Sequence, residues 1–500
     1  MAKFDVILST DRSLMTDHHG SEFLGFGTTM PLILPRSFIQ WLFCPPVRHN
    51  NGVVWQAPYG LRRIEARLLR DGVKAAVIDP DYVPRYLEDG AKILIIRHHD
   101  WFGLNPPTTT WTAFTDKEPL NVVLFREFIE MVARMKSRVE FKLIVVGPAV
   151  WQWLHRWELI DKYGVDVIID SNGDREELVV SRIVRMILRG RQPPSYVKIG
   201  FKDSLPIEEL TPIRHASVNG LVEIGRGCPR RCAFCSVGGR PLRWYPLDFI
   251  EEEIRVNARE GLDHGILHAS DVLLYGSRDI IPKLDPVLKV NKLAKRYWKR
   301  VGWSHCSLAA AVAGEKVLRR VVEEVIDGVN QRMLGVEVGL ESGSPRIMRI
   351  HMPAKPRPFT PEEWPEVAVH AFSLFHELNV VPAATIIVGL PGEEEDDVKA
   401  TTELVKRLRP YRSLIVPMFF VPMGPSRLGR NEWFRRIKPY HVDLLMACLE
   451  HALYWANRLV DEYLRGAKYA LVRRGLKFIL SLADRNKWRI REYLTSIAEK

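Results

Sequence analysis

The sequence predicts an α/β protein made of two successive α/β modules and a helical extension. Apolar, strand-like segments alternate with helical segments over residues 1–190, and the alternation resumes near Ala216. Such alternation is typical of a parallel sheet whose strands are joined by crossover helices. From about Trp433 onward, the apolar residues recur at helical spacing.

The first module is predicted from a series of short apolar runs. Strands are expected over residues 4–9, 75–79, 92–97, 141–148 and 165–170, and helices over residues 59–72 and 179–190. Open parallel sheets bind ligands at the carboxyl ends of their strands. We therefore expect residues 1–190 to form a ligand-binding domain, with loops 97–103 and 147–151 near the ligand.

The second module follows a proline-rich segment, residues 191–215, which is predicted to be a linker. Six strands are expected after it, over residues 218–225, 264–270, 301–307, 334–341, 380–391 and 413–422. With their intervening helices they predict a partial barrel over residues 216–430. Residues 431–500 are expected to form a helical C-terminal domain.

Composition narrows the class of protein. Six cysteines among 500 residues are too few for a disulfide framework. With neither a long apolar segment nor a secretory signal in view, we expect a cytoplasmic protein without membrane insertion. The net charge of +12 fits a solvated basic surface or an acidic partner. No nucleic-acid-binding motif accompanies the basic residues, so no nucleic-acid partner is predicted.

Three cysteines, Cys228, Cys232 and Cys235, follow the first strand of the second module in the run Arg-Gly-Cys-Pro-Arg-Arg-Cys-Ala-Phe-Cys. Chance would place such a Cys-X3-Cys-X2-Cys run in on the order of one in a thousand chains of this composition. Three thiolates can hold three irons of a cubane cluster and leave the fourth iron open to a substrate. Zinc is the alternative, but closed zinc sites take four protein ligands, and no fourth Cys or His stands at a matching spacing.

The motif resembles the signature of radical S-adenosylmethionine (SAM) enzymes, Cys-X3-Cys-X-aromatic-Cys. This resemblance implies a [4Fe-4S] cluster at the three cysteines, an external electron donor, and reductive cleavage of SAM to a 5′-deoxyadenosyl radical. It also assigns SAM binding to residues at the expected strand ends and in the motif: Phe234, Ser270, Asp271, Glu337, Glu341, Ser342 and Gly389. Alternatively, these strand-end residues form ordinary helix caps and turns. No residue is assigned to chemistry on the substrate.

The longer Arg-Gly-Cys-Pro form and the preceding α/β module resemble the cobalamin-dependent branch of these enzymes. The resemblance implies an N-terminal Rossmann-like cobalamin-binding domain, a partial (β/α)6 TIM-like radical SAM barrel and a C-terminal helical extension. Its candidate cobalamin neighbours are His98, His99, Asp100 and Gly147. The sequence departs from the Asp-X-His-X-X-Gly cobalamin pattern, because residues 17–20 read Asp-His-His-Gly. A cofactor without a histidine ligand and a domain that has lost cobalamin both remain open.

The implied reaction is methyl transfer from methylcobalamin to an unactivated sp3 carbon, with two SAM molecules used per turnover. The chain resembles archaeal C-methyltransferases that act on methyl-coenzyme M reductase, so a protein or peptide substrate is expected, with glutamine or arginine as the modified residue. One alternative is radical C–C or C–S coupling without cobalamin, as in a lipid-coupling synthase. A methylthiotransferase would need three more N-terminal cysteines, and this half contains only Cys44. The non-enzyme alternative is an iron-sulfur or nucleic-acid-binding protein.

Overall fold

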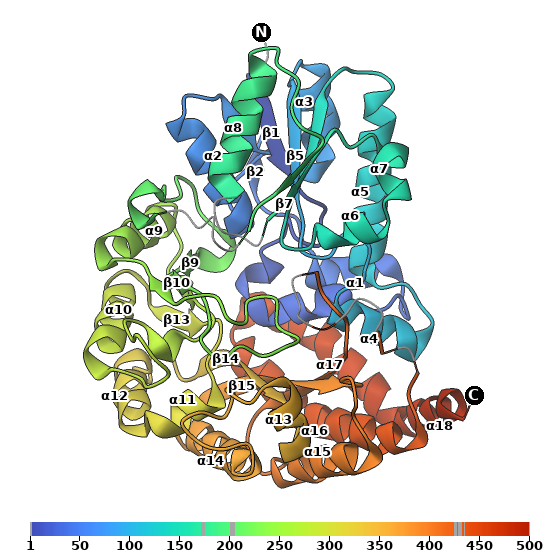
Figure 1. Ribbon diagram of the computed structural model, residues 1–500, viewed down its shortest axis with the longest axis vertical. Helices are drawn as coiled ribbons and strands as arrows, with labels where there is room; N and C mark the ends of the chain where they lie inside the picture. The colour runs from blue at the N-terminus through green and yellow to red at the C-terminus, as the bar shows by residue number, and fades with distance from the viewer. Residues whose placement is uncertain are drawn as a thin grey trace. The chain divides into compact units, whose positions relative to one another are not determined.

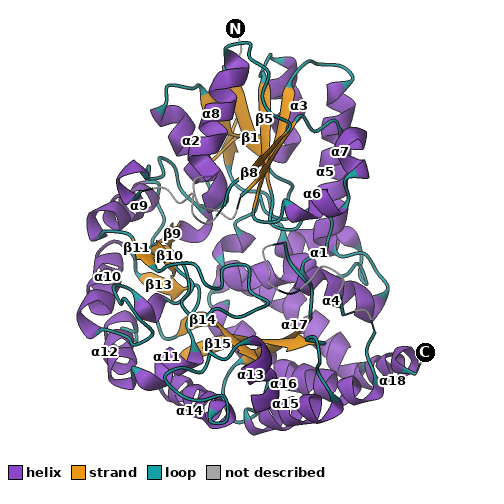
Figure 2. Ribbon diagram, viewed as in Figure 1, coloured by secondary structure: helices purple, strands orange, loops and turns teal. Residues whose placement is uncertain are grey.

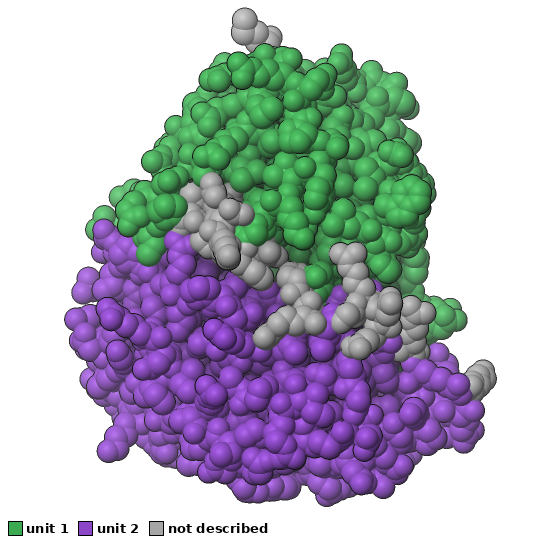
Figure 3. Space-filling view, viewed as in Figure 1, with its two compact units in different colours: residues 1–221, 252–262, 423–425 green, residues 222–251, 263–422, 426–500 purple. Residues whose placement is uncertain are grey.

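The computed structural model describes residues 3–171, 176–200, 206–424, 428, 433, 434 and 436–499. The chain divides into two compact units, which Figure 3 colours separately. Unit 1 comprises Met1–Leu221, Glu252–Leu262 and Met423–Pro425, and unit 2 comprises Val222–Glu251, Asp263–Pro422 and Ser426–Lys500. Within the described part of the chain, the helices are all too short or too polar to cross a bilayer.

Unit 1 is built on a six-stranded parallel sheet in the order β4-β1-β5-β6-β7-β8 (Figures 1 and 2). Its strands are β1 (Val6–Ser9), β4 (Ala75–Val77), β5 (Ile93–Arg97), β6 (Lys142–Gly147), β7 (Val167–Asp170) and β8 (Tyr196–Lys198). Its helices are α1 (Arg36–Phe43), α2 (Tyr59–Arg70), α3 (Val83–Glu88), α4 (Pro106–Thr115), α5 (Leu120–Lys136), α6 (Trp151–His155), α7 (Glu158–Tyr163) and α8 (Glu176–Leu188). The chain order reverses between β1 and β5, and in folds of this kind that point marks the ligand crevice.

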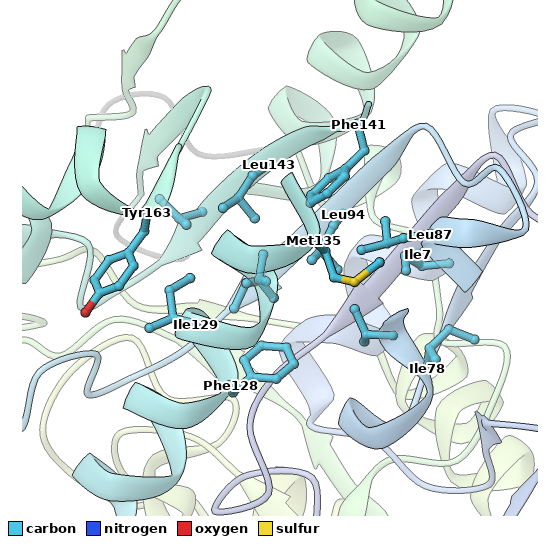
Figure 4. Packing of buried hydrophobic residues seen from close by; sticks show 14 of the residues in the cluster. Ile7, Ile78, Leu87, Leu94, Phe128, Ile129, Met135, Phe141, Leu143 and Tyr163 are labelled. Atoms are coloured by element: carbon cyan, nitrogen blue, oxygen red, sulfur yellow. The ribbon is translucent and has the colours of Figure 1, made fainter. Parts of the chain in front are cut away.

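The strands of unit 1 are apolar on both faces because helices cover both faces of the sheet. Successive side chains alternate between the faces: Ile7 packs with α5, whereas Val6 and Leu8 pack with α2 and α8. Figure 4 shows the first of these cores, where Phe128, Ile129 and Met135 of α5 meet strand residues. Burial on both faces explains why each of these strands is a continuous apolar run in the sequence.

Two segments of unit 1 carry more structure than the sequence indicates. The expected linker contributes β8, which pairs with β7 through Ile168–Tyr196, Ile169–Val197 and Asp170–Lys198. Its three residues are too few to show a strand pattern. The connection after β1 contains α1 and a small hairpin of β2 (His49–Asn50) and β3 (Val53–Val54).

Unit 2 contains the expected partial barrel, and the predicted α/β fold class is confirmed. Two three-stranded sheets, β13-β12-β9 and β14-β15-β16, adjoin through a parallel bridge between His305 and Glu337. The strands are β9 (Leu221–Glu223), whose first residue belongs to unit 1, β12 (His264–His268), β13 (Arg300–Trp303), β14 (Leu334–Glu341), β15 (Val380–Val388) and β16 (Leu414–Phe419). The helices between them are α9 (Leu247–Arg259), α10 (Leu284–Tyr297), α11 (Leu308–Ala313), α12 (Glu315–Val325), α13 (Pro345–His351), α14 (Trp364–Glu377) and α15 (Glu395–Arg407).

The end of the chain is helical, as the apolar spacing predicts. It consists of α16 (Pro439–Tyr463), α17 (Ala470–Arg485) and α18 (Lys487–Ala498). Helix α16 packs on β16, where Leu459 and Trp455 meet Val381 and Leu414 in a small apolar cluster. These helices therefore group with unit 2.

Candidate functional site

The three motif cysteines lie on one loop that is closed by a short antiparallel hairpin. Strands β10 (Gly225–Arg226) and β11 (Arg243–Trp244) pair at its base. Above them, the Cys228 amide donates to the Arg240 carbonyl at 3.1 Å, and the Gly239 amide donates to the Cys228 carbonyl at 3.1 Å. Gly227 has a φ of +98°, and a Cβ there would meet the Pro241 carbonyl oxygen at 2.0 Å. Glycine is therefore required at this position.

The cysteine thiols are close enough to influence one another electrostatically. Cys232 is buried, and Cys228 and Cys235 are half-buried. Burial raises the pKa of Cys228, and it raises the pKa of Cys232 to about 12 against the opposing charge of Lys355. The other two motif thiols raise the Cys232 pKa further. The described residues contain no ready-made group of three metal ligands, but three thiols on one loop suit a multinuclear cluster, whose positive irons would favour the thiolate form.

Arg230, within this loop, and Asp271, which follows β12, are both buried and keep polar atoms unpartnered among the described residues. Nη1 of Arg230 donates to the carbonyls of Lys355 and Arg357, at 2.6 and 2.8 Å, whereas its Nε and Nη2 have no partner there. Asp271 follows β12, and its Oδ2 accepts from the Ser307 hydroxyl at 2.6 Å. Its Oδ1 has no partner in the described chain, and burial raises its pKa against the charge of Arg230.

A second polar group joins the end of β14 to the loop after α13. Lys355 Nζ lies 2.9 Å from Glu341 Oε1, and Glu341 Oε2 accepts from the Thr385 hydroxyl of β15 at 3.1 Å. Glu341 has a φ of +62°, at an irregularity in the pairing of β14 with β15. The charge of Lys355 reaches Cys232 as well. Lys355 therefore forms an ion pair with Glu341 and also acts through its charge on Cys232 of the cysteine loop.

Glu337, in the middle of β14, forms an accessible pair with His305. The carboxylate Oε2 lies 3.0 Å from His305 Nε2, and each side chain keeps more than 40% of its surface exposed. Burial opposes ionisation of Glu337, but the hydrogen bond and charge of His305 outweigh it and lower the pKa. The His268 ring of β12 meets the His305 ring edge-on at 5.9 Å. Strands β12 and β14, with the segment that follows β13, thus bring two imidazoles and a carboxylate together.

The other predicted SAM residues lie at turns of unit 2. Ser270 and Phe234 are half-buried. Ser342 is fully buried, where its hydroxyl contacts the Thr401 hydroxyl at 3.2 Å and accepts from the Ser344 amide at 3.1 Å. Gly389 has a φ of +81° and donates its amide to Glu393, and a Cβ there would meet the Phe434 ring at 1.9 Å. Both residues shape the turns that follow β14 and β15.

The predicted cobalamin neighbours belong to unit 1, at the end of β5. His98 is buried, and its Nε2 lies 2.7 Å from Asp11 Oδ1. Its Nδ1 accepts from the Asp100 amide at 2.9 Å, so Nε2 carries the proton. Burial opposes ionisation of Asp11, but its contact with His98 and hydrogen bonding from Ser13 outweigh burial and lower the Asp11 pKa. Both ring nitrogens of His98 therefore have partners within the protein.

His99 is the member of this set that reaches solvent. Its ring stacks on that of His98 at 5.5 Å. The residue is exposed, and the atoms packed around its ring and the His98 ring lower its pKa, so the imidazole is neutral at neutral pH. Gly147, at the end of β6, approaches this strand end closely, because a Cβ there would lie 3.0 Å from the His98 carbonyl oxygen.

Asp100 is buried and accepts hydrogen bonds with both carboxylate oxygens. The donors are Asn105 N at 3.1 Å, Gln152 Nε2 at 2.8 Å, Thr108 Oγ1 at 2.5 Å and Asn121 Nδ2 at 3.2 Å. These contacts tie the loop after β5 to α4, α5 and α6 of unit 1. Asp100 therefore fixes the loop that carries His99.

Several residues of the site were not predicted from the sequence. Arg230 stands inside the cysteine motif, and its two cysteine neighbours are the signal that could have identified it. His305 follows an expected strand end and could have been found from that position. Lys355 and Asp11 carry no comparable signal, because they reach the site through contacts with residues distant in sequence.

Comparison with known proteins identifies the class of the second unit. The signature of the radical SAM superfamily matches residues 222–405, and these residues form a radical SAM domain. The domain contains the three cysteines and the candidate SAM residues. Their donor set fits a [4Fe-4S] cluster with one open iron, which is the site at which SAM would bind.

The curated relatives match only part of the chain. An uncharacterized protein of Methanopyrus kandleri is 34% identical over 214 residues, which cover 41% of this chain and 38% of that protein. The ribosomal protein uS12 methylthiotransferase of Petrotoga mobilis is 27% identical over 199 residues, 38% of this chain and 40% of that protein. The chain therefore spans about two fifths of the length of these relatives.

Solved structures match over more of the chain. The radical SAM methyltransferase TsrM of Kitasatospora setae, with cobalamin and a [4Fe-4S] cluster bound, has a TM-score of 0.53 and 13% identity. The match covers 85% of this chain and 74% of that one. TsrM with tryptophan and a SAM analogue gives a TM-score of 0.56, over 84% and 74% of the two chains, at 13% identity. The likeness concerns the fold.

Proposed function

We propose that this protein is a cobalamin-dependent radical SAM methyltransferase that methylates an unactivated sp3 carbon of a protein or peptide residue. The observation that carries the proposal is the extent of the fold likeness. It covers 85% of the chain, and the matched structure has cobalamin and a [4Fe-4S] cluster bound. Such a match must include unit 1 as well as the radical SAM domain, which occupies residues 222–405.

The residues of unit 2 have distinct tasks in this proposal. Cys228, Cys232 and Cys235 bind the cluster, and the β10–β11 hairpin holds their loop in place. Asp271, oriented by Ser307, offers its unpartnered Oδ1 to the methionine amine of SAM. When bound, the cluster supplies an electron to SAM and cobalamin supplies a methyl group. Glu337 and His305 face solvent from neighbouring strands and are available to a polar group of the substrate.

In unit 1, the crevice between β1 and β5 is the proposed cobalamin site. Asp11, His98 and Asp100 hold the strand ends there through hydrogen bonds, and His99 presents a neutral imidazole. Glutamine and arginine of methyl-coenzyme M reductase are the residues that we propose to test first as substrates. We place the protein in the cytoplasm and expect it to need an external electron donor.

Methylthio transfer is the second candidate, because two of the relatives are ribosomal protein uS12 methylthiotransferases. Against it, Cys44 is the only cysteine before the radical SAM motif, and burial raises the pKa of its thiol well above the usual value. The chain before the radical SAM motif therefore lacks the three cysteines that a second cluster would require. The methyltransferase proposal therefore fits the cysteine content better.

The test uses the full chain reconstituted with iron, sulfide and hydroxocobalamin, and supplied with dithionite. With SAM carrying a deuterated methyl group and peptides containing the candidate glutamine or arginine, we expect 5′-deoxyadenosine and a peptide heavier by one labelled methyl. Sulfur addition to the peptide would support methylthio transfer instead. Production of 5′-deoxyadenosine by cobalt-free enzyme with an unmethylated, coupled product would favour cobalamin-independent coupling.

A further inference from the structure

The cysteine loop contains a buried arginine that is held rigidly on one side. Arg230 lies between Cys228 and Cys232 in sequence and is only 5% exposed. Its Nη1 donates to the carbonyls of Lys355 and Arg357, at 2.6 and 2.8 Å. Two short contacts from one nitrogen fix the guanidinium plane, so the direction of the remaining donors is fixed as well.

The remaining donors of Arg230 are buried and unused. Nε and Nη2 have no hydrogen-bond partner within the described ranges of the chain. These two nitrogens lie on the same edge of the guanidinium, and this edge can donate two parallel hydrogen bonds to an anion. A buried, charged donor without a partner is costly, so its presence indicates that an anion belongs at this edge.

A second cation lies close by. The Lys355 side chain is 12% exposed, and its Nζ lies 2.9 Å from Glu341 Oε1. Its positive charge acts on Cys232, and that of Arg230 acts on Cys228. Two of the three cluster thiols therefore lie within electrostatic reach of a cation, Arg230 being buried and Lys355 half-buried. Glu341 accounts for the charge of Lys355, whereas the charge of Arg230 acts on Asp271 without forming an ion pair among the described residues.

A cluster held by three thiolates is anionic, and reduction adds a further negative charge inside the protein. Buried positive charge and N–H donors to sulfur both stabilise the reduced form and so raise the reduction potential. We propose that Arg230 is a positioning residue that directs its Nε–H and Nη2–H edge at the anionic sulfur of the cluster, and that Arg230 and Lys355 together make the cluster easier to reduce. The proposal requires the cluster but neither cobalamin nor methyl transfer.

The test is a redox titration of the reconstituted full chain without SAM, followed by electron paramagnetic resonance. We expect Arg230→Gln to shift the midpoint potential to a lower value while the iron content stays that of the wild type. The matched control is Arg231→Gln, which removes the same charge from the adjacent, exposed position of the loop. It should leave the potential close to that of the wild type. An Arg230→Gln potential equal to that of Arg231→Gln would overturn the proposal.

Two further variants separate charge from geometry. Arg230→Lys keeps the charge but loses the two-nitrogen edge, so its potential should fall between those of the wild type and Arg230→Gln. Lys355→Met should also lower the potential, and it provides the test if Arg230→Gln fails to retain iron. Unchanged potentials in Arg230→Lys and Lys355→Met would contradict the proposal.

The same variants distinguish the cluster from the SAM carboxylate as the anion. SAM binding is measured separately, by the change that SAM causes in the spectrum of the reduced cluster. If Arg230→Gln weakens this binding and leaves the SAM-free potential unchanged, the anion is the carboxylate and the proposal is wrong. Failure of the wild-type chain itself to bind iron would instead contradict the cluster assignment on which the proposal rests.

Discussion

The loop after β5 in unit 1 and the cysteine loop in unit 2 differ in how many of their buried polar groups have hydrogen-bond partners. In unit 1, Asp100 accepts four hydrogen bonds, and both ring nitrogens of His98 have protein partners. In unit 2, the described residues leave Nε and Nη2 of Arg230 and Oδ1 of Asp271 unpartnered. Buried polar groups are usually satisfied. The charged and imidazole groups of the first loop are therefore satisfied within the protein, although Trp101 Nε1 there has no partner among the described residues, whereas Arg230 and Asp271 keep polar atoms that a ligand could satisfy.

The largest expected effect is the loss of the cluster from the cysteine loop of unit 2. Cys232→Ala removes one of three cluster ligands, so the reconstituted chain should lose its cluster and all production of 5′-deoxyadenosine. Iron and sulfide analysis, together with a 5′-deoxyadenosine assay, measures both losses. The control is Cys448→Ala, which changes a buried thiol of α16 outside the motif and should keep the iron. Equal iron in both variants would refute the cluster assignment.

The next effect concerns the turn after β15. Gly389→Ala places a Cβ at 1.9 Å from the Phe434 ring and at a φ of +81°. We expect it to lower the free energy of unfolding by about 3 kcal/mol, through overpacking added to backbone strain. Gly392 has a φ of +75° but open space around it, so Gly392→Ala should cost about 1 kcal/mol. Denaturant titration of the two variants measures the difference, and equal costs would show that Phe434 moves aside freely.

A smaller effect is expected on the stability of unit 1, where Asp11 contacts His98. Asp11→Asn weakens the buried contact with His98 and should cost about 2 kcal/mol at neutral pH. The pKa of Asp11 is lowered from its ordinary value of 3.8, so the carboxylate contributes stability above that pH and loses it as pH falls through the folded-state pKa. The gap between wild type and variant should therefore narrow on acidification below about pH 4. Unfolding curves over this range check the sign, and a gap that widens would contradict the assignment.

The smallest effect separates turn geometry from ligand binding. Ser342→Ala removes a fully buried hydroxyl that contacts Thr401 and accepts from the Ser344 amide. We expect a loss of about 1 kcal/mol in unfolding free energy. Isothermal titration with SAM tests the sequence assignment of Ser342 in the same variant. Weaker SAM binding would support a ligand role, and unchanged binding with reduced stability would leave Ser342 as a turn residue.

The strands and the cysteine motif could be predicted because their signals are local. Val6–Ser9 is a buried run, Leu334–Glu341 alternates buried and half-buried residues, and the three cysteines stand within eight positions of one another. The confirmed α/β fold class follows from the alternation of such runs with amphipathic helices. Strand β8 was missed because three residues beside two prolines are too short for periodicity to register.

The partners of the site residues could not be predicted, because contacts between distant residues depend on the packed fold. His98 meets Asp11 from 87 positions away, and Ser307 meets Asp271 from 36 positions away. Glu341 was expected from its strand end, but its pairing with Lys355 depends on the loop that follows α13. Local patterns identify the residue types of a site, whereas the folded structure determines which of them are already satisfied.

Metal analysis tests the proposal that a cobalamin-binding unit is joined to a radical SAM domain. The full chain is reconstituted anaerobically with iron, sulfide and hydroxocobalamin, desalted, and analysed for cobalt and iron alongside its absorbance spectrum. We expect about one cobalt and about four irons per chain. Four irons without retained cobalt would contradict the proposal and assign the protein to cobalamin-independent radical coupling.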